Sequence, residues 1–258
     1  MSQVEITVVL DKSGSMYNQI DDTLGGFNSF VDEQRGVDNA RLTLITFSNN
    51  IHTNYESVHV KEVQKLTQKS YKPSGGTALL DAIGTAIKKN DELCGDTKKM
   101  VVIITDGQEN SSKKYTKAHV NDLISDRRAR DWEFVFLAAN QDAIETGQSY
   151  GIAPESALSF NQQGATQEAF EVAAQAVYRS VASQDKDTKV AFTPVQRQKS
   201  MGHQPIRTPP VVRPCNTAPS TINEGDVQSL HSNEDGSLYT SNSLEIPENP
   251  EPPRLVRQ

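Results

Sequence analysis

Cysteine is scarce in this chain of 258 residues, and the two cysteines present, Cys94 and Cys215, lie far apart in the sequence. This excludes a small disulfide-stabilised fold and leads us to expect a reducing, cytoplasmic location. No apolar run is long enough to span a membrane, and the N-terminus lacks the pattern of a signal peptide. Acidic residues outnumber basic ones, with a formal net charge of −7, so neither a membrane nor nucleic acid is expected as a partner.

Proline is also rare in most of the chain, and its distribution divides the sequence in two. Ten of the twelve prolines lie between Pro194 and Pro253. The sequence after residue 183 also has few aromatic residues and no sustained apolar period, which is typical of disorder. We therefore predict one folded domain over residues 1–183 and a disordered tail rich in Pro, Ser and Asn over residues 184–258.

Short apolar runs alternate with helical patterns throughout the predicted domain. The runs predict six strands, and apolar residues three and four apart predict helices between most of them. Only three residues separate the second run from the third, so these two form a hairpin and the third is an antiparallel edge strand. The remaining alternation predicts an α/β fold with a doubly wound, mostly parallel six-stranded sheet and helices on both faces. The expected strands lie near residues 4–10, 41–47, 51–60, 99–105, 132–139 and 157–160.

Oxygen-bearing side chains gather in three of the predicted loops. Asp11, Ser13 and Ser15 alternate in the turn after the first strand. Thr77 stands at the predicted N-cap of a helix, and Asp106 directly follows the most apolar strand. The carboxyl ends of parallel strands meet at one edge of a sheet, where α/β folds bind ligands. Carboxylates and hydroxyls without thiol or imidazole favour Mg²⁺, with Mn²⁺ or Ca²⁺ as alternatives, and disfavour zinc.

The order of these loops resembles the von Willebrand factor type A domain. That family carries Asp-x-Ser-x-Ser after the first strand, a threonine in a later loop and Asp-Gly after the fourth strand. Residues 11–15, 75–77 and 105–107 match this pattern in order. Residues 77–84 and 105–110 are similar to the compact intracellular members of bacteria and their phages. The resemblance covers the predicted domain and does not extend to the predicted tail.

The resemblance implies a metal-ion-dependent adhesion site, in which the hydroxyls bind a divalent cation directly and the carboxylates act through water. An Asp or Glu of a partner protein would then complete the coordination of the ion. Intracellular relatives work beside ring ATPases or in multiprotein assemblies, so a partner of either kind is implied. Lys12 departs from the family pattern, and together with Gly76 and Gln108 it is expected at the partner-binding rim. The implied metal ligands are Asp11, Ser13, Ser15, Thr77 and Asp106.

Two other functions are open from the residues alone. A metal-assisted, phosphatase-like hydrolase would use Asp11 as its nucleophile, but Ser13 replaces the second acid that such enzymes carry two residues later. Alternatively, a scaffold would recruit its partners through residues 184–258. A serine hydrolase needs a histidine base, and the histidines of the predicted domain fit ordinary surface positions. We therefore predict a protein-binding module that depends on a divalent cation and has no catalytic residue.

Overall fold

A six-stranded sheet forms the centre of the computed structural model, which describes residues 3–94, 97–139, 142–161, 165–183 and 188–202. Its strand order is β3-β2-β1-β4-β5-β6. β3 pairs antiparallel with β2, and every other neighbouring pair is parallel, which confirms the predicted fold class. The strands are β1 (Gln3–Asp11), β2 (Ala40–Phe47), β3 (Ile51–His59), β4 (Thr97–Thr105), β5 (Glu133–Ala139) and β6 (Ala157–Phe160).

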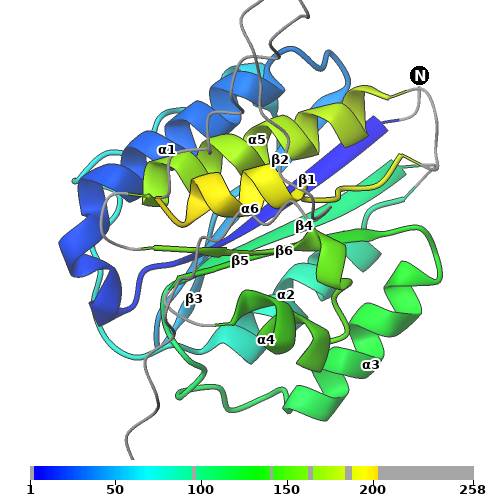
Figure 1. Cartoon of the computed structure of the whole chain (residues 1–258). Coiled ribbons are helices and arrows are strands. Elements are labelled where there is room, and N and C mark those ends of the chain that lie inside the picture. Colours follow the sequence, from blue (N-terminus) through cyan, green and yellow to red (C-terminus); the bar gives the residue numbers. More distant parts are fainter. Residues whose placement is uncertain (1–2, 95–96, 140–141, 162–164, 184–187, 203–258) are drawn as a thin grey trace, which may run out of the picture. The chain divides into compact units, whose positions relative to one another are not determined.

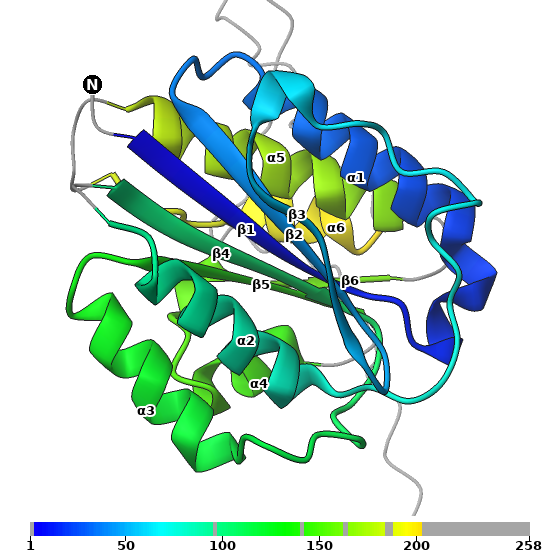
Figure 2. The ribbon, with the colours of Figure 1, turned by 180° about the vertical axis from the view of Figure 1, so that it is seen from behind.

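Helices cover both faces of this sheet. Figures 1 and 2 show α1, α5 and α6 on one face and α2, α3 and α4 on the other. A short 3₁₀ helix, η1 (Gly14–Gln19), precedes α1. None of the helices in the described part of the chain has both the length and the apolar character that a bilayer crossing requires. The helices are α1 (Ile20–Gln34), α2 (Leu79–Asp91), α3 (Lys117–Arg128), α4 (Ala143–Ser149), α5 (Thr166–Ala182) and α6 (Pro194–Ser200).

The central strands are apolar on both faces because each face is covered by helices. In β1, Ile6, Val8 and Leu10 belong to the core under α1 and α5, whereas Val9 belongs to the core under α2 and α3. β1 and β4 run side by side, with Leu10 paired to Ile104. The next residue of each strand therefore lies at the carboxyl edge of the sheet, and both residues there are polar.

Residues 188–202 lie within the predicted tail but pack against the folded domain. Val190 and Phe192 are buried in the same core as α1 and α5. The Val190 N–H donates to Glu133 of β5 at 2.8 Å, and Arg197 of α6 donates to the carbonyl of Pro154 at 2.9 Å. The packed chain thus continues to residue 202, beyond the predicted boundary at residue 183. Residues 184–187 and 203–258 of the predicted tail lie outside the described residues.

Candidate metal centre

The turn after β1 is fixed by backbone hydrogen bonds to two neighbouring segments. The Lys12 N–H donates to the carbonyl of Phe47 at the end of β2, at 2.7 Å. The Gly14 N–H donates to the carbonyl of Gly75 at 2.9 Å. Gly75 has a φ of +79°, a left-handed conformation that a residue with a side chain adopts only with strain. The loop around residue 75 is therefore held against the turn after β1.

Four of the five predicted metal ligands form one hydrogen-bonded chain. The Ser13 N–H donates to Asp11 Oδ1 at 2.7 Å, and the hydroxyl oxygens of Ser13 and Ser15 lie 3.0 Å apart. The Ser15 hydroxyl donates to Asp106 Oδ1 at 2.6 Å, across 91 positions of sequence. Asp11 and Ser13 are buried, Asp106 is half-buried and Ser15 is exposed. The cluster is therefore buried at Asp11 and open to solvent at Ser15.

Thr77 lies beside the same cluster. A Cβ atom built on Gly107 would stand 3.0 Å from Thr77 Oγ1 and 3.5 Å from Ser15 Oγ, so both hydroxyls lie around one point. The Thr77 N–H donates to Asn110 Oδ1 at 2.8 Å, which ties this segment to the loop after β4. The predicted N-cap role of Thr77 is wrong, because α2 begins one residue later and Ala78 is its N-cap. The structure thus gathers all five predicted ligands at one edge of the sheet.

Asp11 is the most buried acid of the cluster. Its side chain is fully shielded from solvent, and its Oδ2 accepts a 2.6 Å hydrogen bond from the Thr105 hydroxyl. Burial raises the pKa of Asp11 to about 6; hydrogen bonds from Thr105 and Ser13 oppose the rise, and the charge of Asp106 adds to it. A cation beside two such carboxylates favours their ionised forms. The electrostatics of the cluster therefore suit a positively charged ligand.

Two further acids organise the loop between β4 and α3. Glu109 accepts the N–H of Leu80, which lies in the first turn of α2, at 2.9 Å. Asp81, also in the first turn of α2, accepts the backbone N–H groups of Lys113 and Lys114, each at 2.9 Å. These bonds use backbone groups that would otherwise lack partners at the start of a helix and in a loop. They hold the loop that contains Asp106 against α2.

The three predicted rim residues differ in environment. Lys12 is half-buried, whereas Gln108 is exposed. The Gly76 N–H donates to Asn49 Oδ1 at 2.6 Å, and a Cβ built on Gly76 would come within 2.2 Å of Ser111 Oγ. A side chain at position 76 would therefore require the nearby polar side chains to shift. Contact of these three residues with a partner stays a prediction.

Three residues that support the cluster were not predicted from the sequence. The Thr105 hydroxyl donates a hydrogen bond to Asp11. The sequence feature that could have indicated this role is a polar residue at the end of an apolar strand, here the strand next to β1. The Tyr71 hydroxyl donates to the backbone carbonyl of Asp11 at 2.5 Å. Gln19 Nε2 donates to Asp106 Oδ2 at 2.7 Å. The contacts of Tyr71 and Gln19 join residues 60 and 87 positions apart, and no local pattern indicates them.

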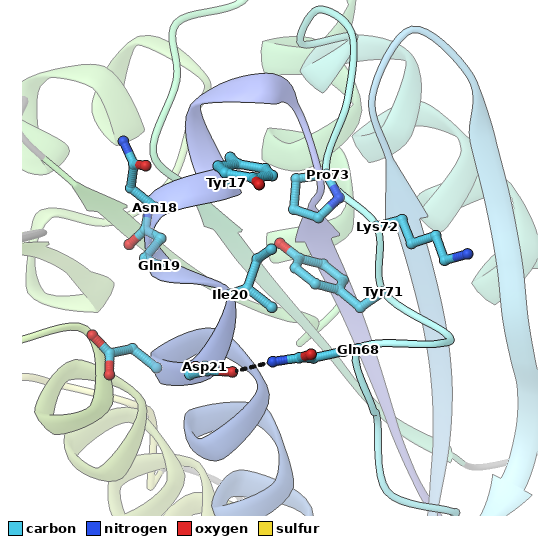
Figure 3. Close-up of a pocket in the computed structure, with 10 residues that line it drawn as sticks. Tyr17, Asn18, Gln19, Ile20, Asp21, Gln68, Tyr71, Lys72 and Pro73 are labelled. Atoms are coloured by element: carbon cyan, nitrogen blue, oxygen red, sulfur yellow. Dashed lines mark hydrogen bonds between the residues drawn. The ribbon is translucent and has the colours of Figure 1, made fainter.

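A groove of about 630 Å³ lies beside the cluster, between the start of α1 and residues 68–73. In Figure 3, Tyr17 and Pro73 form its upper part, and a hydrogen bond joins Asp21 to Gln68 below them. Tyr17 is 68% exposed. Gln19 and Tyr71, which contact the cluster, belong to the lining, but the five predicted ligands do not. The groove is therefore an adjoining surface and not the ion site itself.

The donor atoms of the cluster indicate the class of ligand that fits. Among the described residues, no group of three or more His, Cys, Asp or Glu side chains is placed to hold a metal ion. The cluster instead combines two carboxylates with three hydroxyls, all of them hard oxygen donors. Such a set is suited to a divalent cation that takes oxygen ligands.

The fold and the cluster define an α/β domain with an oxygen-donor site at the carboxyl edge of its sheet. The family model for the von Willebrand factor type A domain matches residues 5–172, well over half of the chain. The chain therefore belongs to this family. A comparison with curated proteins gave no match.

Solved structures with a similar fold include an adhesin and a byssus protein. The pilus adhesin SpaC of Lactobacillus rhamnosus GG, in its open conformation, is 15% identical with a TM-score of 0.56; the match covers 70% of this chain and 30% of SpaC. Proximal thread matrix protein 1 from the mussel byssus is 14% identical with a TM-score of 0.50, and the match covers 70% of this chain and 46% of that protein. The chain therefore spans less than half the length of either protein.

Proposed function

We propose that this chain is a protein-binding module that depends on a divalent cation, with Mg²⁺ as the expected ion. The observation that carries the proposal is the hydrogen-bonded chain from Asp11 through Ser13 and Ser15 to Asp106, with the Thr77 hydroxyl beside it. These residues come from three loops and converge where α/β folds bind ligands. Membership of a family of interaction modules also supports the proposal.

The charges of the cluster explain why a partner would be an acid. Asp11 and Asp106 supply two negative charges, and the three hydroxyls add oxygen atoms without further charge. The two carboxylates then balance the charge of a bound divalent ion, but its coordination shell is not full. The ion therefore supplies a Lewis-acidic position for one more anionic oxygen. We propose that an exposed Asp or Glu of a partner protein takes this position. Ring ATPases and multiprotein assemblies are the classes of partner that we propose.

The environment of Asp11 argues against the alternative of a hydrolase. A nucleophilic carboxylate needs an oxygen atom that a substrate can approach. Asp11 is fully buried, Oδ1 accepts from the Ser13 N–H, and Oδ2 accepts from the Thr105 hydroxyl. We therefore propose no catalytic step at this residue.

Loss of partner binding on removal of residues 203–258, with metal binding intact, would favour the scaffold alternative.

Titration calorimetry with Mg²⁺ tests the ion site directly. We expect the wild-type chain to bind one ion and Thr77→Ala to bind it at least tenfold more weakly. Thr85→Ala is the matched control, because Thr85 lies on α2 and its hydroxyl donates to the Asp81 carbonyl. The proposal is overturned if the wild-type chain binds no ion, or if Thr77→Ala binds it as tightly as Thr85→Ala does.

A capture experiment tests the partner. Wild-type chain on a resin should retain proteins that are released by chelator, and Thr77→Ala should not retain them. Replacing the exposed Asp and Glu residues of a captured protein, one at a time, should identify a single acid on which binding depends. Capture that chelator does not affect would contradict the proposed mode of binding.

A further inference from the structure

Gln19 is a buried polar residue beside the candidate metal centre. It ends η1, directly before α1, and its side chain is 4% exposed. Its Nε2 donates to Asp106 Oδ2 at 2.7 Å, and its Oε1 accepts a 3.0 Å hydrogen bond from the hydroxyl of Thr166, the first residue of α5. Figure 3 shows the Gln19 side chain directed away from Pro73 and Tyr71. The Gln19 amide therefore connects Asp106 of the candidate metal centre to the start of α5.

We propose that Gln19 is a positioning residue, which fixes the orientation of the Asp106 carboxylate for the cation. The inference rests on the proposed function, because it concerns the same ion site. The torsion that rotates an Asp carboxylate has a broad energy profile, so a single hydrogen bond does not fix it. Ser15 holds Oδ1 at 2.6 Å and Gln19 holds Oδ2 at 2.7 Å, which together fix the carboxylate plane.

An amide suits this role because it holds the acid without changing the charge of the site. A carboxylate oxygen only accepts hydrogen bonds, so Asp106 requires the NH₂ end of the amide. A lysine would neutralise one of the two negative charges that attract the ion. An apolar side chain of similar length would leave Asp106 Oδ2 without this donor and Thr166 without this acceptor. Of these, only the neutral donor–acceptor group serves both neighbours.

Thr166 fixes the other end of the amide. Its side chain is 1% exposed, and its hydroxyl donates to Gln19 Oε1, which turns Nε2 toward Asp106. α5 packs against α1 in the same core, so Thr166 lies at the start of a packed helix. Partners behind a metal ligand of this kind generally change metal affinity by about 10–100-fold when they are removed.

The test compares two buried glutamines of the same region. Gln19→Met keeps the length of the side chain and removes its hydrogen bonds to Asp106 and Thr166, together with a 3.4 Å hydrogen bond from Nε2 to Met16 Sδ. Gln34→Met is the matched control, because Gln34 is also fully buried and donates to the Ala174 carbonyl at 3.0 Å, at the far end of α1. Mg²⁺ affinity is measured by calorimetry and stability by urea denaturation. We expect both variants to lose stability, but only Gln19→Met to bind Mg²⁺ about 10–100-fold more weakly.

Thr166→Val provides a second, milder variant in case Gln19→Met does not fold. It removes the anchor of the amide and should weaken Mg²⁺ binding in the same direction by a smaller factor. Unchanged affinity in both Thr166→Val and any folded Gln19→Met chain would overturn the proposal and make Gln19 purely structural. Absence of Mg²⁺ binding by the wild-type chain would instead overturn the proposed function, so the two failures are distinguishable.

Discussion

The Thr105 hydroxyl donates a 2.6 Å hydrogen bond to Oδ2 of Asp11, and both residues are fully buried. The bond joins the ends of two neighbouring parallel strands at the edge of the sheet. Because the Ser13 N–H occupies Oδ1, the Asp11 carboxylate is held from both sides. Asp11 is therefore a structural element of this edge as well as a predicted metal ligand.

Replacement of Thr105 by valine should destabilise the domain. Valine keeps the shape of threonine but leaves a buried carboxylate with one donor fewer, so we expect a loss of about 1–3 kcal/mol in the free energy of unfolding. Urea denaturation at neutral pH without added metal measures this loss. Thr105→Ser restores the donor and should recover most of it. Equal stability of the valine variant and the wild type would mean that the hydrogen bonds of the Thr105 hydroxyl, to Asp11 and to the Gly107 backbone, contribute nothing net.

Mg²⁺ should stabilise the wild-type chain through linkage. An ion that binds only the folded state adds about 2.7 kcal/mol at a concentration of 100 times its Kd, and so raises the Tm. Asp106→Ala should abolish this rise and leave the far-ultraviolet spectrum unchanged, because Asp106 lies in a half-buried loop position. Asp122→Ala, at an exposed position of α3, should keep the full rise. An equal rise in all three chains would place the ion elsewhere.

Asp81 should make stability depend on pH. Burial raises the pKa of Asp81, but hydrogen bonds from the backbone N–H groups of Lys113, Tyr115 and Lys114 outweigh this, and the pKa lies below its ordinary value. A folded-state pKa below the unfolded one stabilises the fold at higher pH, and this contribution disappears as the pH falls through the folded-state pKa. We expect Asp81→Asn to cost about 1–3 kcal/mol at pH 7.

The difference in the free energy of unfolding between wild type and Asp81→Asn should become smaller as the pH is lowered below 3.8, the ordinary pKa of Asp. Urea denaturation over a series of pH values measures this difference. Asp122→Asn, at an exposed position, controls for the loss of one negative charge. A difference that stays constant to the lowest pH at which the chain folds would show that the charge of Asp81 is irrelevant.

Two adjacent glycines of α1 should respond oppositely to alanine. Nothing lies within 4 Å of a Cβ built on Gly25, whereas a Cβ on Gly26 would come within 2.5 Å of the Phe170 ring on α5. Alanine is favoured over glycine in a helix by about 1 kcal/mol, so Gly25→Ala should stabilise the domain. Overpacking typically costs about 1–3 kcal/mol, so Gly26→Ala should destabilise it. Thermal unfolding of the pair measures both changes, and equal Tm shifts would contradict the packing of α1 on α5.

The sequence predicted the parts of the structure that depend on neighbouring residues. Uniformly apolar strands such as β4 and the three-residue connection before β3 were sufficient for the sheet. The polar residues of the site were predicted because each stands in a short motif at the end of a strand or before a helix. Gln19 was not predicted, because its contact with Asp106 is set by tertiary packing across 87 positions. The same limit applies to Asn110, which holds Thr77 across 33 positions.

The packing of residues 188–202, beyond the predicted boundary at residue 183, was not predicted for a related reason. After residue 183 the sequence has no apolar period, and only isolated residues such as Val190 and Phe192 enter the core. Their burial depends on β5 and on the residues before β6, which bind the backbone of Val190 and Phe192 and which no window of sequence near residue 190 contains. Composition therefore indicated disorder where the structure has a packed segment.

Truncation should measure how much this segment contributes. Removing residues 184–258 deletes Val190 and Phe192 from the core and leaves the buried Glu133 without the Val190 N–H. We expect the chain of residues 1–183 to be several kcal/mol less stable than the chain of residues 1–202, because losing a buried Phe side chain alone costs about 3 kcal/mol.

Within the full-length chain, the two side chains to compare are Phe192 and Val195. Phe192→Ala should lower the free energy of unfolding by about 3 kcal/mol, since the ring is 5% exposed. Val195→Ala, where the side chain on α6 is 62% exposed, should change it by less than about 0.5 kcal/mol. If chains 1–183 and 1–202 unfold at the same urea concentration, residues 188–202 do not stabilise the domain, whatever surface they cover.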